Sequence, residues 1–408
     1  MRGNGDSWRK YRWHWKCAEK TVLTEKLIHY FRQIPDYRCG REKRHDLGEM
    51  LVCVTLGFLC GRTTIRRSLK WCKTHLEELR KHMNLKYGIA SPSTITRMLN
   101  GIDEELALYA FMEWIGEIVE SRNTHLAIDG KALCGATEKT KGETTPMLLN
   151  VVETVRGLIL AQLPVDSKTN EITAIPELLK LLDISGSIVT IDAVGTQTAI
   201  MEQIHEQGGH FVLTVKKNQP EAYEEIHTFM DKLGAEDLKR KKGEAMDPGM
   251  KEFLEKYEEI SQMEKNRDRN EYRTCQICKD ASNLTKSQKE WPHVQSIGRI
   301  KQVRIPKEKD SQGNDVTPSK EEFLEKGSRR IPAPSAGEGA GKDVQCTALI
   351  SDLILTAEEL GSIKRMHWSI ENRLHHVLDD TFREDRSPAK KSRNNLSLIR
   401  KYAYNILR

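Results

Sequence analysis

Three acidic residues stand where carboxylates are useful for chemistry and unfavourable for packing. Asp129 follows the apolar run 126–128, Asp192 follows the apolar run 188–191, and Glu371 lies between apolar residues of a helical pattern. A single Asp-Gly after a strand is more often a turn than a site. Two such aspartates, each followed by small residues, favour a site in which carboxylates hold a metal ion.

The chemistry of such a set is that of hard divalent cations. Mg²⁺ binds carboxylate oxygens and keeps waters and substrate phosphates in its remaining positions. Two such ions about 3.5–4 Å apart activate the attacking oxygen and stabilise the leaving oxygen in a displacement at phosphorus. Asp129, Asp192 and Glu371 therefore predict a Mg²⁺ site, in which Mn²⁺ can substitute, and phosphodiester chemistry on a polynucleotide.

Glu371 belongs to a helical segment that also carries histidines. His367, Glu371 and His375 are four residues apart and so share one helix face. A zinc cluster would need several nitrogen or sulfur ligands at tight spacing, so we interpret Glu371 as a third oxygen ligand. We expect His367, His375 and Asn372 to support it by orientation or by contact with DNA phosphate. A solvated charged face is the alternative, and it is weakened by the interleaved apolar residues Ile370, Leu374 and Leu378.

The periodicity of the sequence changes at residue 124 from helical to strand-like. The order that follows is β-β-β-α-β-α-β-α, which predicts an α/β fold with a mixed sheet flanked by helices. Asp129 and Asp192 then end the first and fourth strands. Adjacent strands lie about 4.8 Å apart, so neighbouring positions would let the two carboxylates share a cation. The predicted strands are 126–128, 147–155, 157–164, 188–191 and 211–215, and the predicted helices are 175–182, with a proline in its first turn, 198–206 and one begun by Pro220.

Residues 21–120 have a helical pattern that fits a DNA-binding domain. Ser91-Pro92 begins a short helix that resembles the second helix of a helix-turn-helix, and Asp103 caps another helix. An ordinary helical bundle with a solvated basic face explains this pattern equally well. Residues 1–20 interleave bases with aromatics and could grip nucleic acid, or could be a frayed tail. The bases that we expect to contact the DNA backbone are Arg66, Arg67, Arg97, Lys131, Lys216 and Lys217.

The last part of the chain divides into an insertion and a return to helix. Residues 232–345 are highly charged, with predicted strands at 272–278, 294–305 and 344–349 and a mobile loop at 307–343. Thr356 and Glu359 have the spacing of a capping box. We therefore expect a catalytic core made of residues 121–231 and 346–408, interrupted by an insertion at 232–345.

The composition limits the class of protein. A chain of 408 residues with 38% hydrophobic residues predicts two or three domains. The longest apolar run, 51–60, is too short to span a membrane and predicts a buried helix. Nine cysteines make no dense disulfide framework, and the lone CxxC at 275–278 lies in a strand-like run. We expect a cytoplasmic, nucleoid-associated protein, and its net charge of +6 leans towards a polyanionic partner.

Several longer motifs occur in a fixed order along the chain. They are residues 31–36 (FRQIPD), 127–131 (AIDGK), 165–179 (VDSKTNEITAIPELL), 189–193 (VTIDA), 215–220 (VKKNQP) and 367–375 (HWSIENRLH). This set resembles the ISAs1 family of insertion-sequence transposases, the group that includes the H-repeat-associated proteins. The resemblance implies an RNase H-like core with Asp129, Asp192 and Glu371 as a DDE triad, dependence on Mg²⁺, and an N-terminal transposase-associated domain.

The resemblance also implies the substrate and leaves two functions open. The first is a DNA transposase that cuts and joins double-stranded DNA at the terminal inverted repeats of its element and in the target. Paired-end chemistry of this kind implies a homodimer on DNA. The second is a decayed or domesticated copy that binds inverted-repeat DNA without cutting it.

Overall fold

The fold is known from a computed structural model, which describes residues 17–136, 145–165, 171–265, 269–284, 291–306, 308–309, 315–316 and 344–408. The tail predicted at residues 1–20 lies outside the described residues up to residue 16. The loop predicted at 307–343 also lies outside them, apart from the two-residue strands β9 (Glu308–Lys309) and β10 (Asp315–Val316).

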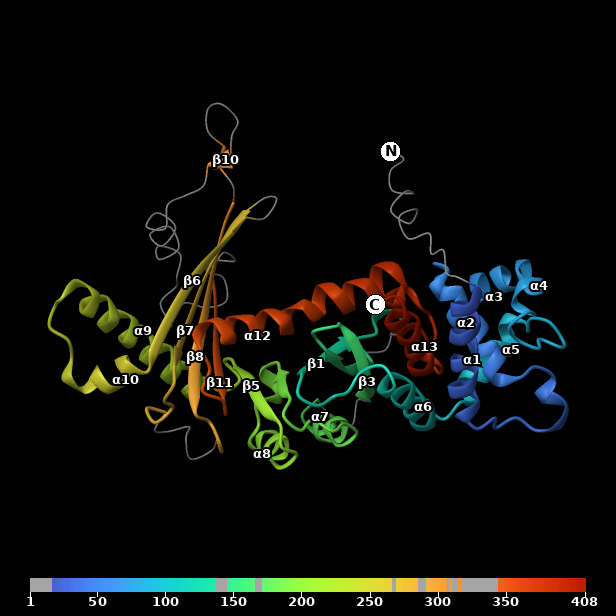
Figure 1. The fold of residues 1–408 in the computed structure, drawn as a ribbon, viewed down its shortest axis with the longest axis horizontal. Coiled ribbons are helices and arrows are strands. Elements are labelled where there is room, and N and C mark those ends of the chain that lie inside the picture. The colour runs from blue at the N-terminus through green and yellow to red at the C-terminus, as the bar shows by residue number, and fades with distance from the viewer. Residues whose placement is uncertain are drawn as a thin grey trace.

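Within the described residues, the organising element is a mixed sheet of nine strands in the order β3-β2-β1-β4-β5-β11-β8-β7-β6. Helices cover it, as the prediction of an α/β fold requires (Figure 1). The strands are β1 (His125–Ala132), β2 (Met147–Glu153), β3 (Leu158–Val165), β4 (Ile188–Ile191), β5 (His210–Val215), β6 (Tyr257–Lys265), β7 (Arg269–Cys278), β8 (Ser296–Pro306) and β11 (Val344–Ser351).

The first five strands form an RNase H-like half of the sheet. β2 is antiparallel to both β1 and β3, whereas β1, β4 and β5 are parallel to one another. The parallel strands are connected through α7 (Glu171–Lys180) and α8 (Thr198–Glu206). The predictions of β4 and α8 agree with the structure at both ends.

The strands of the predicted insertion extend this sheet instead of forming one of their own. β11 pairs antiparallel with β5 on one side and with β8 on the other, and β7 and β6 follow. α9 (Pro220–Lys242) and α10 (Lys251–Glu255) lie beside these long strands (Figure 1). The CxxC at 275–278 lies in β7 with both thiols buried, as its strand-like pattern predicted.

The long helix α12 (Ala357–Ile370) runs across the sheet and contacts strands of both halves, from β1 to β6 (Figure 1). Its N-terminus has the predicted capping box, because Thr356 and Glu359 bond each other's backbone amides. Leu360 and Ile363 pack with Val212 and Leu349 in an apolar cluster under the helix. These contacts fix the position of the residues that follow α12.

The N-terminal region is helical, as predicted. Ser91 caps α5 through the amide of Thr94, and Asp103 caps α6. The apolar run at 51–60 lies in the buried helix α2, and no helix among the described residues is long and apolar enough to cross a membrane. The helices of this region are α1 (Cys17–Gln33), α2 (Leu47–Leu59), α3 (Ile65–Thr74), α4 (Leu76–Leu79), α5 (Pro92–Gly101) and α6 (Glu104–Gly116).

The last helix, α13 (Arg393–Ile406), joins the helical region to the sheet by packing against α2, α6 and β3. Tyr402 forms an aromatic cluster with Phe31, Phe111 and Trp114. On the sheet side, the ammonium group of Lys401 is fully buried and donates hydrogen bonds to the side-chain oxygens of two buried amides, Asn150 and Gln162. One helix therefore belongs to both cores.

Two expectations about element ends were wrong. α7 begins at Glu171, four residues earlier than predicted, so Pro176 lies inside the helix and not in its first turn. Asp129 does not end its strand, because β1 continues to Ala132. The pairing explains this: β4 stops at Ile191, whereas β2 remains paired with β1 as far as Ala132.

We predict that Lys401→Ala destabilises the protein by about 2–5 kcal/mol. The substitution leaves the buried amide oxygens of Asn150 and Gln162 without a donor and opens a cavity between α13 and the sheet. Urea denaturation measures the change. Lys180→Ala, which removes a surface ion pair with Glu177, should cost less than about 1 kcal/mol. Equal effects of the two substitutions would contradict a structural role for the buried network.

Candidate metal centre

Asp129 and Asp192 lie beside each other at the point where two parallel strands separate. Ile128 of β1 is in register with Ile191 of β4, so the next residues along the two chains are the two aspartates. Neighbouring strands are about 4.8 Å apart, and the charge of Asp192 is felt at Asp129. The adjacency that the strand order suggested is therefore present.

Glu371 and His375 are brought to Asp129 by the helical segment after α12. The Nδ1 atom of His375 lies 3.6 Å from Oδ2 of Asp129 and 3.4 Å from Oε2 of Glu371. One potential ligand atom of each of these residues lies within 4.8 Å of the others. The three form a group of metal-ligand spacing, with His375 buried, Asp129 half-buried and Glu371 exposed.

The segment that carries Glu371 is not an ordinary α-helix. Residues Glu371–His375 and Val377–Thr381 are π-helical, with hydrogen bonds from the amide of His376 to the carbonyl of Glu371 and from Phe382 to Val377. Such wide turns are rare and frequently occur at functional sites. The predicted apolar stripe is nevertheless present, because Ile370, Leu374 and Leu378 are all buried.

The carboxylate of Asp192 has a different partner. Oδ2 of Asp192 is 2.7 Å from Nζ of Lys216, which follows β5. Burial opposes ionisation of Asp192, but the hydrogen bond from Lys216 and the charges of Lys216 and Lys364 hold its pKa below the ordinary value. Lys364 itself is buried on α12 and donates to Oγ1 of Thr214 at 2.8 Å, and burial lowers its pKa to about 8.

Asp129 carries the electrostatic cost of the site. Burial raises its pKa to about 6, and the negative charges of Asp192, Glu371 and Glu171 add to the shift, against one hydrogen bond from the amide of Gly130. A carboxylate in this position lacks positive charge, and a divalent cation would supply it. Carboxylate oxygens are also the ligands that Mg²⁺ prefers. The residues present therefore fit a divalent metal.

Glu171, the first residue of α7, is an acidic residue of the site that we did not predict. A β-carbon at Gly130 would lie 3.4 Å from its Oε1 atom, so its carboxylate approaches the strand that carries Asp129. Burial and the charge of Asp192 raise the pKa of Glu171. The signal in the sequence was its place within the motif at 165–179, which we used only to establish the family resemblance.

His367 lies apart from the carboxylates that it was expected to orient. It is buried, and its Nδ1 atom is 2.9 Å from Oγ1 of Thr190 in β4, which also contacts Nε2 of His125 at 3.0 Å. Burial lowers the pKa of His367 to about 3, so the ring is neutral. It fixes α12 to β4 and reaches the metal centre only through that packing.

Lys131 was expected to contact DNA, and the structure contradicts this. Its side chain is only 5% exposed, and its Nζ atom lies 2.6 Å from Asp379 and 3.4 Å from Asp385. The prediction failed because a lysine after a strand-end motif was assumed to be at the surface. Lys131 instead fixes the segment after Glu371 to β1.

The other residues that we predicted to bind or to support are at the surface. Lys216 pairs with Asp192, and Lys217 is exposed beside it. Asn372 is exposed next to Glu371. In the helical region, Arg66 and Arg67 on α3 and Arg97 on α5 are exposed.

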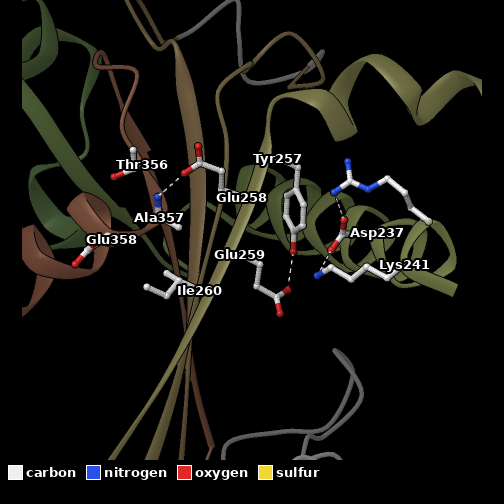
Figure 2. A pocket seen from close by; sticks show the side chains of 10 residues that line it. Asp237, Lys241, Tyr257, Glu258, Glu259, Ile260, Thr356, Ala357 and Glu358 are labelled. Carbon is white, nitrogen blue, oxygen red and sulfur yellow. Dashed lines mark hydrogen bonds and ion pairs between the residues drawn. The ribbon is translucent and has the colours of Figure 1, made fainter.

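A separate hollow of about 450 Å³ lies between α9, β6 and the start of α12, away from the metal centre (Figure 2). Its charges are paired internally: Asp237 binds Arg240 and Lys241, and the carboxylate of Glu258 accepts from the amide of Ala357 at 3.1 Å. The hydroxyl group of Tyr257 donates to Glu259 at 2.8 Å. This hollow holds neighbouring elements together and offers no unbalanced charge to a ligand.

The fold and the acidic site agree with the family models that match the chain. A model described as "Transposase DDE domain" matches residues 120–406, and one described as "DDE_Tnp_1-associated" matches residues 28–115. The first covers more than half of the chain. The protein belongs to the transposase DDE domain family.

Relatives with similar length support this membership. The "H repeat-associated putative transposase YhhI" of Escherichia coli K12 is 28% identical over 94% of this chain and 90% of its own. The "Putative protein YbfL" of the same strain is likewise 28% identical, with the same coverage. Among solved structures, a piggyBac transposase synaptic complex with hairpin DNA aligns with a TM-score of 0.40 and 11% identity, covering 94% of this chain and 73% of that one.

We predict that Asp129→Asn stabilises the metal-free protein at pH 7.5. The pKa of Asp129 is raised in the folded state, so its protonated form contributes stability at low pH, and this contribution is lost as the pH rises from about 4 to about 6. Asn keeps the neutral form at every pH. Allowing for partial exposure of the side chain, the gain should be about 1–2 kcal/mol at pH 7.5 and near zero at pH 4.

Denaturation in EDTA at both pH values measures this difference. The exposed Glu206→Gln is a matched control that removes one negative charge far from the site, and it should change the stability little at either pH. A variant Asp129→Asn that is no more stable than the wild type at pH 7.5 would show that the charge of Asp129 is already compensated.

A second prediction concerns metal binding. Millimolar Mg²⁺ or Mn²⁺ should raise the melting temperature of the wild type, because a ligand of the folded state stabilises it by mass action. The shift should disappear in Asp129→Asn and fall in Glu371→Gln, and it should persist in Glu206→Gln. Thermal unfolding with and without the metal measures it, and equal shifts in all four proteins would exclude metal binding at this centre.

Proposed function

We propose that the protein is a DNA transposase of an insertion sequence, which cuts and joins DNA at terminal inverted repeats. The observation that carries the proposal is the convergence of Asp129 and Glu371, with Asp192 in register on the adjacent strand. Membership of the transposase DDE domain family supports it. The names of relatives, which call them putative transposases, point the same way.

Asp129, Asp192 and Glu371 would hold Mg²⁺, or Mn²⁺ in its place. When bound, such ions lower the pKa of an attacking water or hydroxyl and neutralise charge on the leaving oxygen at phosphorus. The residues contribute ionised oxygens on a rigid support: two come from a paired sheet, and Glu371 comes from a helix fixed by its capping box and by His367.

The nearby polar residues orient this set. His375 faces both Asp129 and Glu371 through Nδ1 and limits the positions that the two carboxylates can take. Lys216 keeps Asp192 ionised and, with the exposed Lys217, lies where a DNA phosphate would approach the acidic residues. Hydrolysis frees a 3′ hydroxyl, and transesterification then joins that hydroxyl to target DNA by the same displacement at phosphorus.

The N-terminal helices would bind the DNA ends. α3 and α5 pack together and present exposed Arg66, Arg67 and Arg97, which suits phosphate contacts by a helix-turn-helix. In this proposal residues 21–120 are the DNA-binding domain, residues 121–231 and 346–408 are the catalytic core, and residues 232–345 are the insertion. Joining two ends requires two active sites, so we expect a homodimer on DNA.

We predict that Asp192→Ala lowers metal-dependent cleavage of DNA carrying the terminal inverted repeats by about 1,000-fold or more. Several kcal/mol of transition-state stabilisation depend on the metal that Asp192 helps to hold, and each 1.36 kcal/mol is a factor of ten in rate. Cleavage of end-labelled DNA in Mg²⁺ and in Mn²⁺ measures the rate, and DNA binding is measured in parallel. Glu206→Gln is the matched control and should cut at the wild-type rate.

The same assay tests the alternative of a non-catalytic DNA-binding protein. If wild type and Asp192→Ala both bind the repeats and neither cuts, the protein is a binding protein that has lost its chemistry. If the two proteins cut at equal rates, Asp192 does not hold the metal, and the proposed site is wrong.

A further inference from the structure

A second hollow of the molecule lies between the N-terminal helices and the segment that follows the metal centre. Its volume is about 920 Å³, and its walls come from two parts of the chain, residues 63–100 and residues 383–400. We call it the basic groove. Six exposed basic residues line it: Arg66, Arg67, Arg383, Arg386, Lys390 and Lys391.

The charge of the basic groove is strongly one-sided. Among the described residues that line it there is no Asp or Glu. The guanidinium groups of Arg66, Arg67, Arg383 and Arg386 form no ion pair with any described carboxylate. This contrasts with the hollow beside α9, in which acidic and basic groups pair with one another (Figure 2). Walls of one sign focus the electrostatic field and attract a ligand of opposite sign.

Helix ends add to this charge. The N-termini of α3, α5 and α13 all border the basic groove, through Thr64, Pro92 and Ser392 respectively. The first-turn amides of a helix point outwards and carry partial positive charge, which favours an anion. The hydroxyl group of Ser392 makes no capping bond within the described structure. Three such ends around one hollow are expected of a phosphate-binding surface.

A buried arginine also reaches this hollow. Arg400 of α13 is 3% exposed, yet it lines the groove. Its Nη1 atom is 3.6 Å from the buried Glu384, its guanidinium lies over the ring of Phe58, and its Nε–H has no hydrogen-bond acceptor among the described residues. An unused donor of a buried arginine is costly, and an anion in the groove would reduce that cost.

The basic groove is rigidly connected to the metal centre. Lys131, two residues after Asp129, binds both Asp379 and Asp385. Asp385 lies between Arg383 and Arg386 in the short helix Glu384–Arg386. A phosphate held by these two arginines is therefore at a fixed position relative to the acidic residues.

We propose that the basic groove binds the phosphodiester backbone of duplex DNA and positions it for the metal centre. The proposal rests on the proposed function and adds to it a surface that the helix-turn-helix alone does not provide. One wall, Arg66 and Arg67, belongs to the N-terminal helices. The other wall belongs to the chain directly after Glu371, so the DNA is held by both parts at once.

The test uses the full chain and compares Arg383→Ala/Arg386→Ala with the wild type on duplex DNA. Fluorescence anisotropy at several salt concentrations gives the dependence of log Kd on log salt. Each lost phosphate contact removes about 0.9 from the slope, so the double variant should lose roughly 2 and bind roughly tenfold or more weakly at low salt. Arg156→Ala/Lys180→Ala removes two exposed bases away from the groove and should keep the wild-type slope.

Additional variants keep the test decisive if the double variant folds poorly. Arg66→Ala/Arg67→Ala removes the opposite wall and should also lower the slope by roughly 2. Arg383→Lys/Arg386→Lys keeps the charge and should restore most of the slope. An unchanged slope in both alanine variants would overturn the proposal. Displacement of DNA by millimolar inorganic phosphate beyond the effect of chloride at equal ionic strength, with unchanged slopes, would identify a site for free phosphate instead.

The result is separable from that of the cleavage assay. If the groove variants bind like the wild type while Asp192→Ala loses cleavage, the groove proposal fails and the proposed function stands. If the groove variants lose affinity while Asp192→Ala cuts like the wild type, the groove proposal stands and the proposed metal centre fails.

Discussion

The repulsion between carboxylates at the end of one strand pair is the constraint on which this structure depends. Parallel pairing of β1 with β4 brings Asp129 next to Asp192, and Glu371 approaches from α12. Without a cation these charges oppose folding, and the raised pKa of Asp129 is the sign of that cost. Much of the surrounding structure resists the repulsion: the capping box fixes the start of α12, His367 fixes its middle, and Lys131 fixes the chain beyond it.

The same constraint explains why the ends of the chain meet. α13 packs against both the N-terminal helices and β3, so the helices that would bind DNA and the sheet that carries the aspartates share one element. Tyr402 faces the first group of elements and Lys401 the second. The basic groove lies along this junction. A ligand that bridges its walls contacts both parts of the protein, and it gains affinity from their being already fixed in place.

The sequence predicted what depends on neighbours along the chain. The limits of β4 and α8, the caps at Ser91 and Asp103 and the adjacency of the two aspartates all followed from local patterns and from the order of strands. Long-range pairing was beyond such patterns. Periodicity gives a strand but not its partner, so the joining of β6–β8 and β11 to the main sheet was not expected, and neither was the burial of Lys131 by two aspartates about 250 residues away. Glu171 was missed because its approach to the site requires the crossover of α7.

The π-helical stretch after α12 has a consequence for how the family can change in length. An α-helix turns by about 100° per residue, and a π turn accommodates an additional residue without turning the next side chains away from the core. Loss of a single residue between Glu371 and Thr381 would convert one wide turn to α geometry and rotate everything beyond it. Leu378 would then leave the apolar core, and Asp379 would leave Lys131. Insertions and deletions should therefore be tolerated in the surface connections of this chain but not in these eleven residues, whose number is as constrained as their chemistry.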